Sequence, residues 1–223
     1  MTHHPSHEPP EQAVLRTRHY FTPQSLRAEN DPPARAVLTP RPTEISARGC
    51  TLEFVTGVGV FSKSGLDAGS RLLIETITFS PHARLCDLGC GWGAVGCFAA
   101  KLAPEAQVWT CDINLNAVML ASGNIRQNNL SQATAWCGNG LKAIGGPSFD
   151  AVFCNPPIRA GNAVIAELFD DAHRSLRPGG ALWIVIRTAQ GAKSWQRRLA
   201  ELFGNCETIA IDGGYRILKC VKV

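Results

Sequence analysis

The alternation of apolar and amphipathic segments constrains the fold of this chain more than any other sequence feature. From residue 49 onward, short apolar runs alternate with stretches whose apolar residues recur at helical spacing. Parallel strands need crossover helices, so the pattern predicts an α/β fold with a mostly parallel sheet and helices on both faces. The expected strands of the sheet lie at residues 84–88, 107–112, 134–137, 149–154, 181–186, 207–211 and 216–221.

The two ends of this pattern differ from the middle. The last two expected strands are joined at Gly213 and Gly214 with no helix between them, which predicts a hairpin and one antiparallel strand. A strand is also expected at 51–56, before a helix that Asp67 caps. In parallel α/β sheets, ligands bind beyond the carboxyl ends of the strands, beside the first strand.

Proline and glycine are distributed unevenly along the chain. Eight of the 14 prolines fall in the first 42 residues, and none of the 21 glycines precedes Gly49. We therefore predict a proline-rich N-terminal arm over residues 1–46 and a single domain over residues 47–223. No apolar run approaches the roughly 20 residues that span a bilayer, and the start lacks the pattern of a secretory signal.

Cysteine usage points to a cytoplasmic protein. The nine cysteines are odd in number and irregular in spacing, and they include no C-x-x-C pair that would favour a metal site. Several lie inside apolar runs, so we expect free thiols packed in the core in a reducing compartment. The net charge of +4 permits an acidic partner such as RNA.

The sequence Asp-Leu-Gly-Cys-Gly-Trp-Gly follows the expected strand at 84–88 and opens a helix. Its glycines allow a close approach of the backbone to a ligand, although 91–96 also fits the dinucleotide pattern G-x-G-x-x-G. The acid favours S-adenosylmethionine, because a carboxylate attracts its ammonium and sulfonium groups and repels a pyrophosphate. Alternatively, the acid caps the next helix. The predicted cofactor contacts are Asp87, Gly89, Gly91 and Gly93.

Two further strand ends carry candidate cofactor residues. Asp112 ends the strand at 107–112, where a carboxylate can accept hydrogen bonds from both ribose hydroxyls, and Ile113 follows it. Asn139 lies between two glycines after the next strand and is a candidate for the adenine amino group; a plain turn is the alternative.

Asn155-Pro156-Pro157 follows the expected strand at 149–154. The prolines restrict the backbone, so the Asn155 side chain and the Pro156 carbonyl can act as fixed acceptors for the two N–H groups of a planar amine. An amine held in this way can direct its lone pair at a methyl sulfonium. The predicted reaction is an in-line methyl transfer that needs neither a metal nor a covalent intermediate.

Together these motifs resemble class I methyltransferases that act on amino nitrogens. The segment 57–70 is similar to the block upstream of the core in the methyltransferase small domain family, which includes the catalytic half of the small-subunit ribosomal RNA guanine-N2 methyltransferases. The resemblance runs from about residue 48 to the C-terminus and includes 155–161, 188–193 and 213–219. It implies a Rossmann-like seven-stranded sheet of order 3-2-1-4-5-7-6 with strand 7 antiparallel, S-adenosylmethionine as cofactor, and RNA as substrate.

The chain departs from that family in the residue that follows Asn-Pro-Pro. Many Asn-Pro-Pro enzymes continue with an aromatic residue that stacks on the target base, whereas this chain has Ile158. Arg159 or Phe61 would then have to supply a planar surface. The predicted substrate contacts are Phe61, Ser62, Lys63, Ile158 and Arg159.

The sequence hypothesis is thus a cytoplasmic N-methyltransferase whose target is the exocyclic N2 of a guanine in ribosomal RNA. An adenine N6, a protein glutamine or a small-molecule amine are alternative acceptors. A non-catalytic RNA-binding module and a nicotinamide oxidoreductase are alternatives of other classes. The oligomeric state, monomer or homodimer, stays open.

Overall fold

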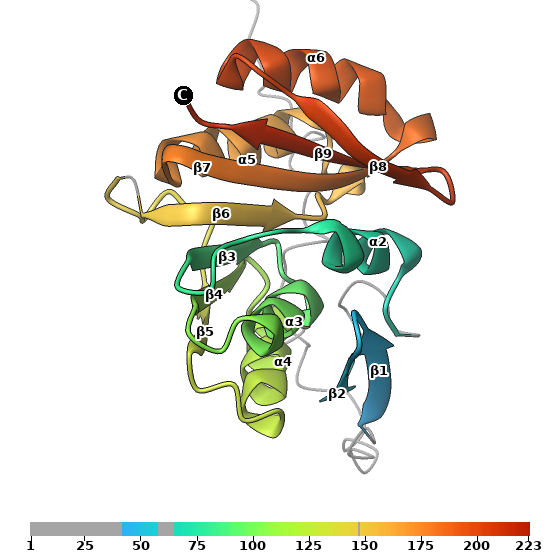
Figure 1. Ribbon diagram of the computed structural model, residues 1–223, viewed down its shortest axis with the longest axis vertical. Helices are drawn as coiled ribbons and strands as arrows, with labels where there is room; N and C mark the ends of the chain where they lie inside the picture. Colours follow the sequence, from blue (N-terminus) through green and yellow to red (C-terminus); the bar gives the residue numbers. More distant parts are fainter. Residues whose placement is uncertain (1–41, 58–64, 147) are drawn as a thin grey trace, which may run out of the picture.

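A seven-stranded sheet forms the centre of the molecule in the computed structural model, which describes residues 42–57, 65–146 and 148–223 (Figure 1). The strand order is β5-β4-β3-β6-β7-β9-β8, and β9 alone runs against the others. This confirms the predicted order and the antiparallel last strand. The strands are β3 (Arg84–Leu88), β4 (Gln107–Asp112), β5 (Ala133–Cys137), β6 (Phe149–Cys154), β7 (Leu176–Arg187), β8 (Glu207–Asp212) and β9 (Tyr215–Val221).

Within the described residues, five α-helices cover the two faces of this sheet. One apolar core lies between the sheet and α2, α3 and α4, and a second lies between the sheet and α5 and α6. No helix in the described ranges is long and apolar enough to cross a membrane. The helices are α2 (Ala68–Thr76), α3 (Ala94–Leu102), α4 (Leu115–Gln127), α5 (Asn162–Ser175) and α6 (Ala192–Phe203).

Helix α2 begins where the sequence predicts it. The Asp67 side chain accepts hydrogen bonds from the amides of Gly69 and Ser70, both at 3.0 Å, and so satisfies two donors that the helix leaves unpaired. Leu73 and Ile74 are buried in the first core. The cap and the apolar side together fix the position of the first turn of α2 against the sheet.

A two-stranded antiparallel ribbon precedes the sheet. Strand β1 (Thr43–Ala47) pairs with β2 (Cys50–Phe54), whereas the sequence predicts one strand at 51–56 and assigns 1–46 to the arm. Strand β1 forms inside that predicted arm because residues 48 and 49 both adopt positive φ, 47° and 71°, and reverse the chain. The rest of the arm lies outside the described residues.

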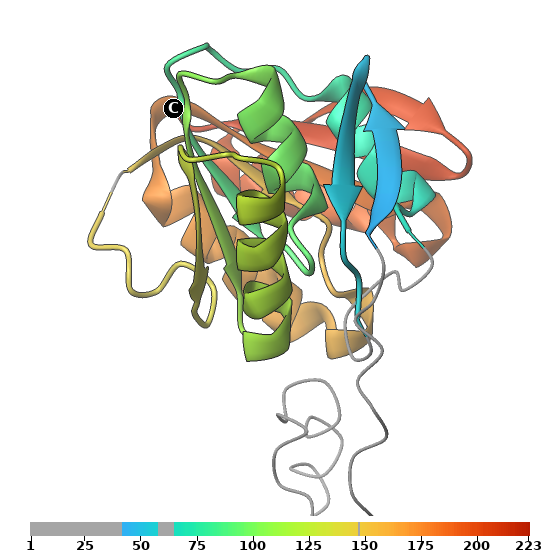
Figure 2. The ribbon, with the colours of Figure 1, turned by 90° about the horizontal axis from the view of Figure 1, so that it is seen from below.

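Asn124 of α4 joins this ribbon to the domain. Its buried amide accepts from Val55 N (2.8 Å) and donates to the carbonyls of Val55 (3.1 Å) and Trp92 (2.8 Å). The ring of Phe54 also packs edge-on against Trp92, with centroids 4.8 Å apart. The ribbon lies beside α3 and α4 in Figure 2, and Trp92 links it to the glycine turn after β3 (residues 89–93).

Strand β7 starts earlier than the sequence predicts. It begins at Leu176 and runs through Pro178-Gly179-Gly180 with a register shift against β6, whereas the expected strand begins at residue 181. Backbone bonds to Lys222 explain the extension, because Gly179 N donates to the Lys222 carbonyl (2.7 Å) and Lys222 N donates to the Gly180 carbonyl (2.9 Å).

The nine cysteines are free thiols. The predicted core packing is confirmed for five of them, and Cys137 is the exposed exception because it ends β5 at the edge of the sheet. The buried cysteines are Cys86, Cys97, Cys111, Cys154 and Cys220.

Two glycines inside helices provide a matched test of how closely α3 packs on the sheet. A β-carbon at Gly96 of α3 would meet Thr110 Cγ2 at 2.4 Å, whereas one at Gly123 of α4 would meet no atom within 4 Å. Gly96→Ala is expected to lower the free energy of unfolding by about 1–3 kcal/mol through overpacking. Gly123→Ala is expected to raise it by roughly 0.5–1 kcal/mol, the difference in helix propensity. Urea denaturation measures both; equal effects of the two substitutions would contradict the close contact of α3 with the sheet.

Candidate cofactor and acceptor site

The site residues lie at or just after the carboxyl ends of three adjacent strands, β3, β4 and β6. Leu88, the last residue of β3, pairs with Cys111 on one side and with Cys154 on the other. Because these strands are parallel, the residues after each pair emerge at the same edge of the sheet. The register therefore brings the glycine turn, Asp112 and Asn155 together, as the strand-end argument predicts.

The glycine turn after β3 presents an open backbone surface. Gly89 and Gly91 have φ of +72° and +55°, values that residues with a side chain rarely adopt. A β-carbon on either would meet no atom within 4 Å. The Cys111 carbonyl accepts the amides of Gly89 (2.8 Å) and Cys90 (2.9 Å), which ties the turn to β4. A ligand can therefore lie directly against the backbone at Gly89 and Gly91.

Gly93 serves a different purpose from the glycines before it. Its amide donates to the Cys90 carbonyl and its carbonyl accepts from Cys97 N, both at 2.9 Å. A β-carbon at Gly93 would lie 2.9 Å from Ala121 Cβ of α4. Both backbone groups and the α-carbon of Gly93 thus contact the protein itself, so its φ of +87° and the close packing of α3 on α4 both favour glycine here.

Asp112 connects the glycine turn to the start of α4 through both of its carboxylate oxygens. One oxygen accepts from Gly91 N (2.9 Å) and the other from Asn114 N (2.8 Å). Burial raises the pKa of Asp112, and the hydrogen bonds from these amides oppose the rise. Ile113, the next residue, is 38% exposed and offers an apolar surface beside the carboxylate. Each oxygen keeps a lone pair for a further donor, such as a ribose hydroxyl.

Asp87 points into the protein rather than outward from the strand end. It is 2% exposed, and one carboxylate oxygen accepts from Gly96 N in the first turn of α3 at 2.9 Å. Gly93, the N-cap of α3, has no side chain to cap the helix, and Asp87 supplies that hydrogen bond from the neighbouring strand. Burial raises the pKa of Asp87 to about 7; the Gly96 amide lowers it and the nearby Asp112 raises it further. The helix-capping alternative is therefore the contact that the structure contains.

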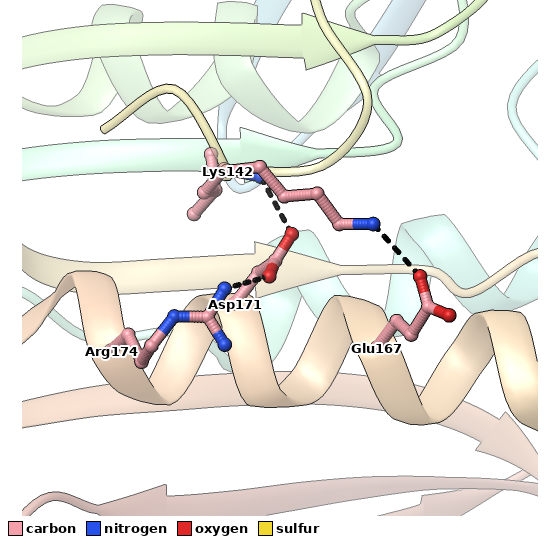
Figure 3. Close-up of polar contacts among 5 residues, drawn as sticks. Lys142, Glu167, Asp171 and Arg174 are labelled. Atoms are coloured by element: carbon pink, nitrogen blue, oxygen red, sulfur yellow. Dashed lines mark hydrogen bonds and ion pairs between the residues drawn. The ribbon is translucent and has the colours of Figure 1, made fainter. Parts of the chain in front are cut away.

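The loop after β5 is anchored to α5 by two polar contacts (Figure 3). Asp171, which is buried, accepts from Leu141 N (3.2 Å) and pairs with Arg174. Lys142 pairs with Glu167 at 2.9 Å on the exposed side. These contacts hold the loop against the second core.

Asn139 lies in this anchored loop with its side chain exposed. A β-carbon at the neighbouring Gly140 would lie 2.3 Å from Asp171 Oδ2, so only glycine allows the loop to approach α5. The structure therefore places Asn139 at the strand-end edge, and its contact with adenine stays a prediction.

Asn155 follows β6 and forms a contact that the sequence analysis missed. Its side-chain Nδ2 donates to the Ser70 hydroxyl of α2 at 3.0 Å. Ser70 is 85 residues away along the chain, and its place three residues after the capping Asp67 was the only local feature that singled it out. The amide nitrogen is thus engaged, and the carbonyl oxygen Oδ1 is the atom left to accept a hydrogen bond. Pro156 is buried and Pro157 is half-buried.

The predicted substrate residues are only partly brought to the site. Ile158 begins the short helix η1 (Ile158–Ala160) and packs against the second core, so its side chain serves packing as well as any contact. Arg159 is exposed beside it. Phe61, Ser62 and Lys63 lie outside the described residues.

The sheet order and the strand-end residues define a class of protein: an S-adenosylmethionine-dependent methyltransferase of class I. The chain belongs to the methyltransferase small domain family, whose model matches residues 51–219.

Individual relatives agree with this assignment. The chain is 35% identical to the uncharacterized protein YbxB of Bacillus subtilis over 173 residues, which cover 76% of this chain and 86% of that protein. It is 35% identical to ribosomal RNA large subunit methyltransferase G of Klebsiella pneumoniae over 171 residues, which cover 74% of this chain. The chain spans only 45% of that enzyme's length.

Among solved structures, the chain is similar to the 16S rRNA N2-guanine methyltransferase RsmC of T. thermophilus, solved in complex with AdoMet and guanosine. The TM-score is 0.73 at 27% identity, covering 82% of this chain and 50% of that one. A methyltransferase from Pyrococcus furiosus shares the fold, with a TM-score of 0.63 at 20% identity, covering 77% of this chain and 89% of that one.

The buried carboxyl group of Asp87 predicts a specific pH dependence of stability. Its pKa of about 7 in the folded state exceeds the value near 3.9 of an unfolded chain, so between these values the folded state binds the extra proton. The free energy of unfolding should fall by about 2–3 kcal/mol from pH 5 to pH 8 on account of this group. In Asp87→Asn, which keeps an acceptor for Gly96 N, that share of the fall should vanish. Urea denaturation at both pH values measures it; an unchanged pH dependence would contradict the buried protonated state.

Proposed function

We propose that this chain transfers a methyl group from S-adenosylmethionine to the exocyclic N2 of a guanine in ribosomal RNA. The observation that carries the proposal is the Asn155 amide, whose nitrogen donates to Ser70 and so leaves its oxygen to accept a hydrogen bond. The named relatives that act on ribosomal RNA, and the guanine-N2 enzyme among the similar structures, support this choice of acceptor. A ribosomal RNA substrate in turn implies a cytoplasmic protein.

The residues of the glycine turn and of β4 fit the cofactor. The backbone at Gly89 and Gly91 leaves room for it, the Asp112 carboxylate would accept from its ribose, and Ile113 would lie beside its adenine. Asn139 would complete the adenine contact. When bound, S-adenosylmethionine supplies a methyl group activated by the positive sulfonium. Asp87 shapes the site indirectly, since it holds the first turn of α3 and adds negative charge beneath the turn when it is ionised.

The acceptor side works by orientation. Asn155 Oδ1 and the Pro156 carbonyl would each accept one N–H of the guanine amino group, so the nitrogen is held with its lone pair free. Two acceptors also stabilise the positive charge that develops on the nitrogen as the new bond forms. The target base would have to leave its stack to reach this edge.

Replacement of Asn155 tests this role directly. Asn155→Ala removes one of the two proposed acceptors and is expected to lower kcat by at least about 100-fold through loss of orientation. The affinity for S-adenosylmethionine, measured by calorimetry, should change little because the ribose and backbone contacts remain. Substantial methyl transfer by Asn155→Ala would refute the role of Asn155.

The hydrogen bond from Asn155 to Ser70 predicts a second, smaller effect. Ser70→Ala removes the bond that fixes the Asn155 amide, so the amide can rotate and present its nitrogen in place of its oxygen; kcat should fall by about 3- to 10-fold. In an Asn155→Asp background both carboxylate oxygens are acceptors, so Ser70→Ala should then cause little further loss. An equal loss in both backgrounds would mean that Ser70 acts through folding alone, which thermal melting of each variant checks.

The acceptor itself is identified by mass spectrometry of modified nucleosides. Ribosomal RNA from cells with and without this gene should differ by one N2-methylguanosine. A difference in N6-methyladenosine would move the assignment to adenine, and tritiated methyl transfer to protein fractions alone would point to a glutamine. Absence of S-adenosylmethionine binding by the purified protein would exclude the reaction altogether.

A further inference from the structure

A stacked arginine–tyrosine pair lies at the edge of the sheet where the acceptor site is found. Arg187 is the last residue of β7 and pairs in register with Tyr215, the first residue of β9. The guanidinium carbon of Arg187 lies 4.9 Å from the centre of the Tyr215 ring. Arg187 is exposed and Tyr215 is half-buried, so the ring supports the guanidinium from the protein side.

This pair is connected to Asn155 through the first turn of α2. Tyr215 packs so closely on Gly69 that a β-carbon there would lie 2.8 Å from the ring. Ser70, the next residue, is the hydrogen-bond partner of Asn155. Neighbouring α-carbons are about 3.8 Å apart, so one turn of helix contacts both the acceptor residue and the stacked pair. The ends of β6 and β7, the start of β9, and α2 all lie toward the right of Figure 1, where the parallel strands have their carboxyl ends.

The register of the sheet gives the same placement independently. Cys154 of β6 pairs with Ile184 of β7, so β7 continues three residues beyond this pair to reach Arg187. Strand β6 ends at Cys154, so Asn-Pro-Pro and Arg187 both follow the last paired residues at the same end of the sheet. The stacked pair therefore lies at the end of β7, the strand next to the one that Asn-Pro-Pro follows.

Within residues 42–57, 65–146 and 148–223, no carboxylate forms an ion pair with Arg187. Arg216, the next residue on β9, adds a second positive charge and donates from Nε to Thr188 Oγ1 at 3.2 Å. A planar cation without a counter-ion suits a ligand that combines a flat ring with negative charge.

We propose that the Arg187–Tyr215 pair is a stacking platform for an unpaired base of the substrate RNA, next to the base that is methylated. Stacked on Tyr215, the guanidinium has one face covered and one face open to a nucleobase, and its charge attracts the adjoining phosphate. Ile158 cannot provide such a planar surface, since it is aliphatic and packs on the core. This inference rests on RNA as the substrate proposed above.

The experiment measures binding of the full-length protein to a fluorescently labelled single-stranded RNA that contains guanine, by anisotropy with S-adenosylmethionine present. Arg187→Ala is expected to weaken RNA binding by about 10-fold, within the range for the loss of one stacked base. Arg187→Lys keeps the charge and loses the plane, so it should weaken binding nearly as much while preserving the salt dependence. Tyr215→Phe keeps the ring and should bind as the wild type does.

Arg198 provides the matched control. It also stacks on an aromatic ring, with its guanidinium carbon 5.5 Å from the centre of the Trp195 ring. However, it belongs to α6, which packs on the second core rather than at the end of β7. Arg198→Ala should leave RNA binding unchanged, and all variants should bind S-adenosylmethionine and melt as the wild type does.

Two results would overturn the platform alone. Full RNA affinity of Arg187→Lys would mean that Arg187 acts only through its charge. Equal effects of Arg187→Ala and Arg198→Ala would mean that the end of β7 has no special role in RNA binding. Failure of the wild type to bind or methylate RNA, with cofactor binding intact, would instead reject the proposed substrate class and the platform with it. The wild-type measurement therefore separates failure of the proposed function from failure of the platform.

Discussion

The site depends on one register in the parallel sheet. Leu88 pairs with Cys111 on one side and Cys154 on the other, so β3, β4 and β6 end level. The glycine turn, the carboxylate that ends β4 and the amide that follows β6 therefore share one edge of the sheet. A slip of one residue in either pairing would move one of them out of that edge and reverse the faces of its strand.

The first turn of α2 connects this edge to the other half of the sheet. It is held by the cap from Asp67, and from there Ser70 contacts Asn155 while Gly69 contacts Tyr215. The Asn155 amide and the stacked pair at the end of β7 thus both contact the first turn of α2. A bulkier residue at Gly69 would disturb both contacts, since its side chain would overlap the Tyr215 ring.

Local motifs predicted the location of the site better than the orientation of its side chains. The strand-end rule put Asp112 and Asn155 at the correct edge, because parallel strands deliver their carboxyl ends together. The direction of Asp87 did not follow from the motif, because it depends on how closely α3 approaches β3. The motif likewise does not separate the open glycine Gly91 from the packed glycine Gly93, since only the neighbouring helix α4 distinguishes them.

The sequence by itself determined the fold class, the strand order implied by the family resemblance, and the residues that end each strand. These depend on periodicity and on short motifs, which are local along the chain. Tertiary structure alone decided that Ser70 contacts Asn155, that Gly69 contacts Tyr215 and that Arg187 stacks on Tyr215. The contact between Ser70 and Asn155 alone joins segments 85 residues apart, and the contacts of α2 arise from its packing across the sheet edge, which no local pattern encodes.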